Sequence, residues 1–121
     1  MITILHLDDS SPLLEDIRDY LEVYGFTVIS CSNVDAAKDF LDQSPMPDFG
    51  IIDLFLDGAG GAHLSNDFIR DYLIPNDIAY IRLTSAPREV PREFSGRGIM
   101  HKKDFYDNPN KLVEIINSLV P

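Results

Sequence analysis

DFGIIDLFLDGAGG, at residues 48–61, is the stretch that indicates how this chain folds. Its apolar, isoleucine-rich run ends at Asp53 and then breaks into glycines, which is typical of a buried strand that delivers one carboxylate to a loop. Ligands bind at the carboxyl ends of the strands in an open parallel sheet, so Asp53 is a candidate functional residue. The ordinary alternative is an acidic side chain that only ends a strand in a turn.

The rest of the chain alternates predicted strands with predicted helices. Strands are expected at residues 2–7, 26–31, 78–83 and 99–100, and the opening stretch supplies the third strand in chain order, which ends at Asp53. Helices fit between them, and this alternation predicts βαβ units that form an α/β, doubly wound, five-stranded parallel sheet with helices on both faces.

Local signals set the expected helix boundaries. Ser11 is the predicted N-cap of the first helix, with Pro12 at its first position, and Gly25 should end it. The segment Ser32–Asp35 resembles a capping box for the second helix. Between Pro87 and Gly98 the prolines leave room only for a short or irregular fourth helix, and Asn108-Pro109 should open the last one.

Size and charge narrow the possible functions. The 121 residues suit a single domain spanning residues 1–121, and the formal net charge of −10 disfavours direct binding to nucleic acids or to an anionic membrane. No signal-peptide or membrane-span pattern occurs, so we expect a cytoplasmic protein. The single cysteine, Cys31, cannot form an internal disulfide and is expected in the core.

Polar side chains follow the predicted strands at the points where they end. Asp8 and Asp9 follow the first strand and Asp53 the third, while Thr84 and Lys102 follow the fourth and fifth. Each has an ordinary explanation as a helix-capping or solvated residue. Together, acids, hydroxyl and lysine on one rim of the sheet indicate a functional site.

These residues lie in motifs that resemble the receiver domain of bacterial two-component response regulators, over essentially the whole chain. The matching motifs are residues 4–9 (ILHLDD), 51–56 (IIDLFL) with Gly61, 83–85 (LTS) and 99–102 (IMHK). The resemblance implies a flavodoxin-like sheet with strand order 2-1-3-4-5. It also implies that Asp53 accepts a phosphoryl group from a sensor histidine kinase or phosphotransfer protein and signals by a conformational change. Such a domain promotes its own phosphorylation and dephosphorylation without being a turnover enzyme; an output domain or partner protein, or a homodimer, would carry the signal.

Phosphoryl transfer to a carboxylate requires charge neutralisation, which a hard cation provides. Mg²⁺ prefers oxygen ligands, so Asp8, Asp9 and Asp53 are its predicted ligands, with the backbone carbonyl of Phe55 added by the resemblance. Lys102 would neutralise a phosphoryl oxygen and the Thr84 hydroxyl would donate to another.

Three positions depart from the family pattern, and a fourth residue, Phe55, bears on the lifetime of the phosphorylated state. Asp57 stands where many receivers have proline. Lys103 replaces the usual cis-proline after the active lysine, so we predict a trans bond and a rearranged loop, and Lys102 and Lys103 are both candidates for that lysine. Ile99 replaces the switch aromatic. Phe55, bulky beside the acceptor, should hinder attacking water and prolong the life of phospho-Asp53.

Other readings of the sequence remain open. A pseudo-receiver, which uses the same fold as a phosphorylation-independent interaction module, is the main alternative. A haloacid-dehalogenase-type phosphatase is disfavoured because Phe55 stands where its acid/base aspartate is needed. Flavodoxin-like cofactor binding is disfavoured because acids replace the glycines and hydroxyls of a phosphate-cradling loop.

The histidines His6, His63 and His101 show no metal-site spacing, so each is expected to be structural or solvated. The basic residues Arg88, Arg92 and Arg97 form a solvated loop or contact an acidic partner.

Overall fold

A computed structural model describes residues 2–56 and 61–120 of the chain. These residues form a five-stranded parallel sheet with strand order β2-β1-β3-β4-β5, so the predicted fold class and strand order are confirmed. The strands are β1 (Thr3–Leu7), β2 (Thr27–Cys31), β3 (Phe49–Ile52), β4 (Ala79–Thr84) and β5 (Ile99–His101).

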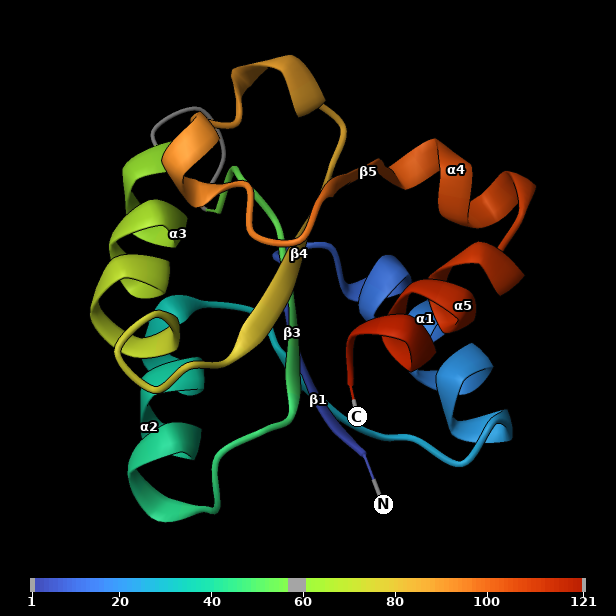
Figure 1. Cartoon of the computed structure of the whole chain (residues 1–121), viewed down its shortest axis with the longest axis horizontal. Coiled ribbons are helices and arrows are strands. Elements are labelled where there is room, and N and C mark those ends of the chain that lie inside the picture. The colour runs from blue at the N-terminus through green and yellow to red at the C-terminus, as the bar shows by residue number, and fades with distance from the viewer. Residues whose placement is uncertain (1, 57–60, 121) are drawn as a thin grey trace.

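Helices cover both faces of the sheet, with α2 and α3 on one side and α1 and α5 on the other (Figure 1). Their bounds are α1 (Ser11–Val23), α2 (Val34–Gln43), α3 (Ala62–Phe68), α4 (Lys102–Asp107) and α5 (Asn110–Leu119). The helix α3 continues into the π-helical turn η2 (Ile69–Leu73), in which the amide of Ile74 donates to the carbonyl of Ile69 at 3.0 Å. No helix within residues 2–56 and 61–120 is long and apolar enough to cross a membrane.

Two apolar clusters hold these layers together. One joins Ile4, Ile51 and Ile81 of the sheet to buried residues of α1 and α5, among them Ile17 and Ile116. The other joins β1 and β3 to α2, α3 and η2, and it includes the buried Cys31, as expected for a core cysteine. Alternate side chains of each central strand enter opposite clusters because successive residues of a strand point to opposite faces.

Helix starts differ from the predicted ones. Ser10, and not Ser11, is the N-cap of α1; its hydroxyl makes no capping bond, and its amide instead donates to Asp8 Oδ1 at 2.9 Å. Asn33, and not Ser32, caps α2, because its side-chain oxygen accepts from the amide of Ala36 at 2.8 Å. The capping-box prediction was therefore wrong by one residue. The sequence did not decide between Ser32 and Asn33 because asparagine is as good an N-cap as serine.

The segment between β4 and β5 has two short 3₁₀ turns, η3 (Pro87–Glu89) and η4 (Arg92–Phe94), where a doubly wound fold usually has a full helix. The prediction of a short or irregular fourth helix is confirmed. Conversely, α4 follows β5 directly and was not predicted. It begins where the His101 ring Nδ1 accepts from the amide of Lys103 at 3.0 Å, and Phe105 anchors it in the core.

Candidate functional site

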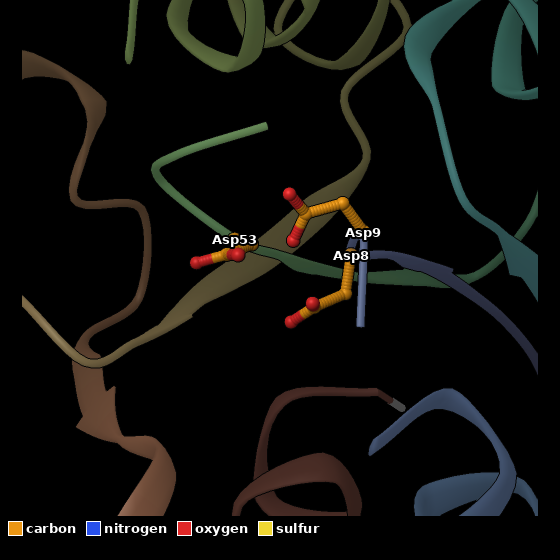
Figure 2. A group of neighbouring side chains, drawn as sticks. All are labelled: Asp8, Asp9 and Asp53. Atoms are coloured by element: carbon orange, nitrogen blue, oxygen red, sulfur yellow. The ribbon is translucent and has the colours of Figure 1, made fainter. Parts of the chain in front are cut away.

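Three carboxylates meet at one edge of the sheet. Asp8 and Asp9 directly follow β1, and Asp53 directly follows β3. The two strands are adjacent and parallel with Leu7 opposite Ile52, so their carboxyl ends bring the acids together. One oxygen of each carboxylate lies within 4.8 Å of the other two, and Figure 2 shows the three side chains extending toward the same side.

The ammonium group of Lys102 neutralises this acidic cluster in part. Its Nζ atom donates to Asp53 Oδ2 at 3.0 Å and to Asp8 Oδ1 at 3.3 Å, and it lies 3.0 Å from Asp8 Oδ2. Lys102 is the first residue of α4, directly after β5, while Lys103 is exposed. The structure therefore places Lys102, and not Lys103, at the acids.

Burial sets the electrostatics of the cluster. Asp8 is fully buried, and loss of hydration together with the charge of Asp53 raises its pKa to about 6. Burial also raises the pKa of Asp53, although the adjacent Lys102 opposes this effect. Burial lowers the pKa of Lys102, but the charges and hydrogen bonds of Asp8 and Asp53 outweigh it and raise that pKa overall. Gathering these acids is unfavourable unless a cation accompanies them.

The donor set fits a divalent cation. Asp8 Oδ2 is buried and accepts no hydrogen bond from the described residues; its contact there is the ion pair with the Lys102 ammonium at 3.0 Å, so the oxygen still has a lone pair for a cation. Asp9 is exposed on the open side of the cluster, which leaves room for water ligands. Oxygen donors with several waters are what Mg²⁺ prefers. Phe55, whose backbone carbonyl is the predicted fourth protein ligand, lines the cleft beside the acids, and the role of that carbonyl stays a prediction.

An open cleft of about 550 Å³ lies over the acids. Its lining includes Asp9, Asp53, Phe55, Thr84, Glu89 and Lys102. The Thr84 side chain is 1% exposed, and its Oγ1 accepts from the amide of Ala86 at 3.1 Å. The hydroxyl proton is therefore free to be donated to a ligand in the cleft.

The departures from the family pattern have mixed outcomes. The Lys102–Lys103 peptide bond is trans, as predicted, and the loop expected there is replaced by α4. Ile99 is 42% exposed on β5. Asp57 lies outside the described residues.

Gly61, one of the residues that match the family motifs, is required by the fold, because a Cβ at this position would overlap the backbone of Leu56.

One residue of the site region was missed from the sequence. Arg82, on β4 two residues before Thr84, is fully buried, and its guanidinium donates to the carbonyl of Asp53 at 3.0 Å. An arginine inside the apolar run Ile78–Leu83 was the signal that could have revealed it, because arginine is almost never fully buried without a specific set of acceptors.

Comparison with solved structures finds proteins of similar fold. No family model matches the chain, and no curated protein matches it in sequence. The response regulator TrrA from Thermotoga maritima, solved in complex with Mg²⁺-BeF, is 20% identical with a TM-score of 0.76, over 99% of this chain and 100% of that one. The Mn²⁺-bound form of response regulator Rcp1 is 22% identical with a TM-score of 0.73, over 100% of this chain and 99% of that one.

A chain in the complex of the P1 domain of CheA3 with CheY6 from R. sphaeroides is 20% identical, with a TM-score of 0.74, and the match covers 98% of this chain and 95% of that one. The present chain therefore has the fold of response-regulator receiver domains, in the flavodoxin-like arrangement of CheY. At the place where the sheet's carboxyl ends meet, it carries an acidic Asp8/Asp9/Asp53 group of the kind found at a phosphoacceptor site. The resemblance seen in the sequence is confirmed at the level of the fold.

Proposed function

We propose that this chain is a response-regulator receiver domain that accepts a phosphoryl group on Asp53. The observation that carries the proposal is the contact of Lys102 with both Asp8 and Asp53, in an acidic cluster whose Asp9, Asp53 and Lys102 line an open cleft. The arrangement has a nucleophile, a cation site and a positive charge for a phosphoryl oxygen, which are the parts that phosphoryl transfer needs.

The donor proposed is a phosphohistidine of a sensor kinase or phosphotransfer protein. One carboxylate oxygen of Asp53 forms a bond to phosphorus while the phosphorus–nitrogen bond of the donor breaks, and the bonding electron pair leaves with the imidazole, which then takes up a proton. The product is an acyl phosphate on Asp53. Asp53 Oδ1 is held by the amide of Leu54 at 2.7 Å, so the carboxylate is oriented before the donor arrives.

Asp8, Asp9, Asp53 and the backbone carbonyl of Phe55 would hold Mg²⁺, which, when bound, offsets the negative charge of the donor's oxygens. Lys102 is placed to exchange its contact with Asp53 for one with a phosphoryl oxygen. Thr84 would donate its hydroxyl hydrogen to another phosphoryl oxygen, and its movement toward the acyl phosphate would report the modification.

The proposal also covers the self-catalysed reactions, the location and the partners of the domain. The domain promotes its own phosphorylation and dephosphorylation and is not a turnover enzyme. It acts in the cytoplasm by contacts with a kinase or phosphotransfer protein and with an output domain, a partner protein or a second copy. The complex of the CheA3 P1 domain with CheY6 supports a kinase-type partner for this fold.

The direct test is incubation with acetyl phosphate and Mg²⁺, followed by intact-mass measurement, together with ¹⁹F NMR of bound beryllofluoride. We expect addition of one phosphoryl group and a bound fluoride signal, both dependent on Mg²⁺. Asp53→Asn should abolish them. Asp39→Asn, which removes an equal charge from an exposed position of α2, is the matched control and should leave both unchanged.

Absence of both signals in the wild-type protein, under conditions in which circular dichroism shows it folded, would contradict the proposal. The pseudo-receiver, a phosphorylation-independent interaction module, would then be the reading that remains. The exposed Ile99 on β5, in the place where the resemblance expects a switch aromatic, is the observation that favours this second candidate.

A further inference from the structure

Arg82 is the most unusual buried group in the described part of the chain. It is the largest fully buried side chain there, and its guanidinium donates five hydrogen bonds. None of these acceptors is a carboxylate, so the positive charge is balanced only by carbonyl and side-chain dipoles. Burial accordingly lowers the pKa of Arg82 to about 10, while the charges of Tyr80 and Asp53 act in the opposite direction. A buried charge without an ion-pair partner is costly, so its acceptors must be held accurately in place.

Two of the acceptors are the backbone of the phosphoacceptor itself. The Nε atom donates to the carbonyl of Ile52 at 3.2 Å, and one Nη atom donates to the carbonyl of Asp53 at 3.0 Å. The same Nη atom donates to Ser65 Oγ at 2.7 Å, and that hydroxyl donates to the carbonyl of Leu54 at 2.6 Å. Three consecutive carbonyls, from residue 52 to residue 54, are therefore fixed by Arg82 directly or through Ser65.

The other Nη atom contacts two different elements. It donates to Asn66 Oδ1 of α3 at 2.9 Å and to the carbonyl of Phe94 in η4 at 3.0 Å. Because a guanidinium group is planar and rigid, it cannot follow a shift of the Asp53 carbonyl without changing its bond to Phe94. Arg82 thus joins the back of the phosphoacceptor site to the irregular segment between β4 and β5.

That segment touches the site at one end and Arg82 at the other. Thr84, Ser85 and Glu89, at its start, line the cleft. Beyond Phe94 the chain returns along β4, where the amide of Arg97 donates to the carbonyl of Tyr80 at 2.8 Å and the amide of Arg82 donates to the carbonyl of Gly98 at 3.0 Å. The exposed backbone of two 3₁₀ turns is held by few hydrogen bonds, so it is the part of this region that can most easily change.

We propose that Arg82 is a positioning residue that fixes the backbone at Asp53 and couples a phosphoryl group there to the structure of the Pro87–Gly98 segment. The coupling rests on the function proposed above, whereas the fixing of Phe94 by Arg82 can be tested in the unmodified protein. The surface that responds to phosphorylation is then the 87–98 segment, with the exposed arginines Arg88 and Arg92, and the coupling needs no aromatic residue at position 99.

The test is amide hydrogen exchange by NMR on the whole chain, with and without Mg²⁺ and beryllofluoride, while ¹⁹F NMR of the same samples reports binding. The variants are Arg82→Met, which removes all five donors, and Arg82→Lys, which keeps the charge and the alkyl chain but cannot reach three elements at once. Arg97→Met is the control, because this exposed arginine lies in the segment and its one hydrogen bond within residues 2–56 and 61–120 is made by its backbone amide.

In the free protein, Arg82→Met and Arg82→Lys should speed exchange at the amides of Phe94, Ser95 and Arg97 by about tenfold, the effect of one lost hydrogen bond, with β1 and β2 little changed. A uniform increase over the whole chain would indicate a merely structural role and would overturn the proposal. Lysine provides the milder change if the methionine variant does not fold.

With beryllofluoride bound, the wild type and Arg97→Met should change their exchange at residues 92–98, and Arg82→Lys should bind the ligand without that change. The coupling alone would be overturned if beryllofluoride binds and the exchange at residues 92–98 changes equally in the wild type and in Arg82→Lys. It would also be overturned if beryllofluoride binds to the wild type without changing that exchange. Absence of the bound signal in the wild type would overturn the proposed function, and the coupling with it.

Discussion

Mg²⁺ binding should weaken sharply between pH 7.5 and pH 5, because protons compete for Asp8. The carboxyl of Asp8 has a pKa raised to about 6 by burial and by the charge of Asp53. A metal ligand must be deprotonated, so the cation and the proton exclude each other at this group. The raised pKa therefore moves the competition into a pH range in which the protein can be studied folded.

The magnitude follows from the ionised fraction of Asp8. With a pKa of about 6, roughly 97% of Asp8 is ionised at pH 7.5 and about 9% at pH 5, so the apparent affinity for Mg²⁺ should fall about tenfold. The pKa of Asp53 is also raised, and its protonation would add to the loss. Tenfold is accordingly the smallest change we expect.

The assay is a Mg²⁺ titration at both pH values, followed through the amide NMR signal of Leu54, which donates to Asp53 Oδ1. Calorimetry at pH 6 in two buffers of different ionisation enthalpy should show release of about half a proton from Asp8 on binding. Asp8→Asn should bind weakly and lose most of the pH dependence, while Asp39→Asn should behave as the wild type. A change of less than about threefold between pH 7.5 and pH 5 would refute this account of the site.

Three further predictions concern single substitutions. Phe55→Asn should shorten the lifetime of phospho-Asp53 by about tenfold or more, because a polar side chain at the cleft wall admits and orients attacking water; equal acyl-phosphate decay in both proteins would contradict this. Gly96→Ala should lower the free energy of unfolding in urea by about 2–4 kcal/mol, since φ is +59° and the new Cβ would overlap the carbonyl and ring of Tyr80. Gly25→Ala is its control, with φ +89° and nothing within 4 Å of the new Cβ, and a loss there as large as at Gly96 would show that contact with Tyr80 is unimportant. His6→Leu should raise the free energy of unfolding at pH 7 by about 1–2 kcal/mol, because both ring nitrogens of His6 are buried and have no hydrogen-bond partner in the described part of the chain. Burial and the charge of Lys102 lower the pKa of His6 to about 3, so between pH 6.5 and pH 3 the unfolded chain binds a proton at His6 that the folded chain does not, and the free energy of unfolding falls as the pH falls through this window; His6→Leu should remove that part of the acid sensitivity, and an unchanged urea-unfolding profile against pH would refute it.

The sheet was predictable from the sequence because its central strands, β1, β3 and β4, are buried on both faces. Apolar runs such as residues 48–52 and 78–83 are typical of buried strands, and their alternation with helices predicts parallel pairing. The gathering of Asp8, Asp9, Asp53, Thr84 and Lys102 could be expected for the same reason, since the residues that follow parallel strands meet at one edge.

Helix ends were predicted less well because neighbouring residues can cap equally well. Ser10 and Ser11 both suit the start of α1, and the choice depends on Asp8, whose side chain accepts the Ser10 amide. Likewise α4 has no long apolar stripe; it is a short helix capped by His101 and anchored by the single buried residue Phe105, and such tertiary support is not visible in periodicity.

The burial of Arg82 is indicated by the apolar run around it, but its hydrogen-bond acceptors could not have been predicted from the sequence, and the reason bears on how the domain would signal. Its acceptors come from residues 52–53, 65–66 and 94, which only the folded chain brings together. An apolar side chain at this strand position would pack against α3 without contacting Phe94. The arginine instead provides a rigid connection from the Asp53 carbonyl to the segment between β4 and β5, in a chain whose fifth strand carries the aliphatic Ile99. Since a ligand shifts a conformational equilibrium only through contacts that differ between the two states, we expect these hydrogen bonds to differ between the free and the phosphorylated protein, together with the contacts of Lys102 and Thr84.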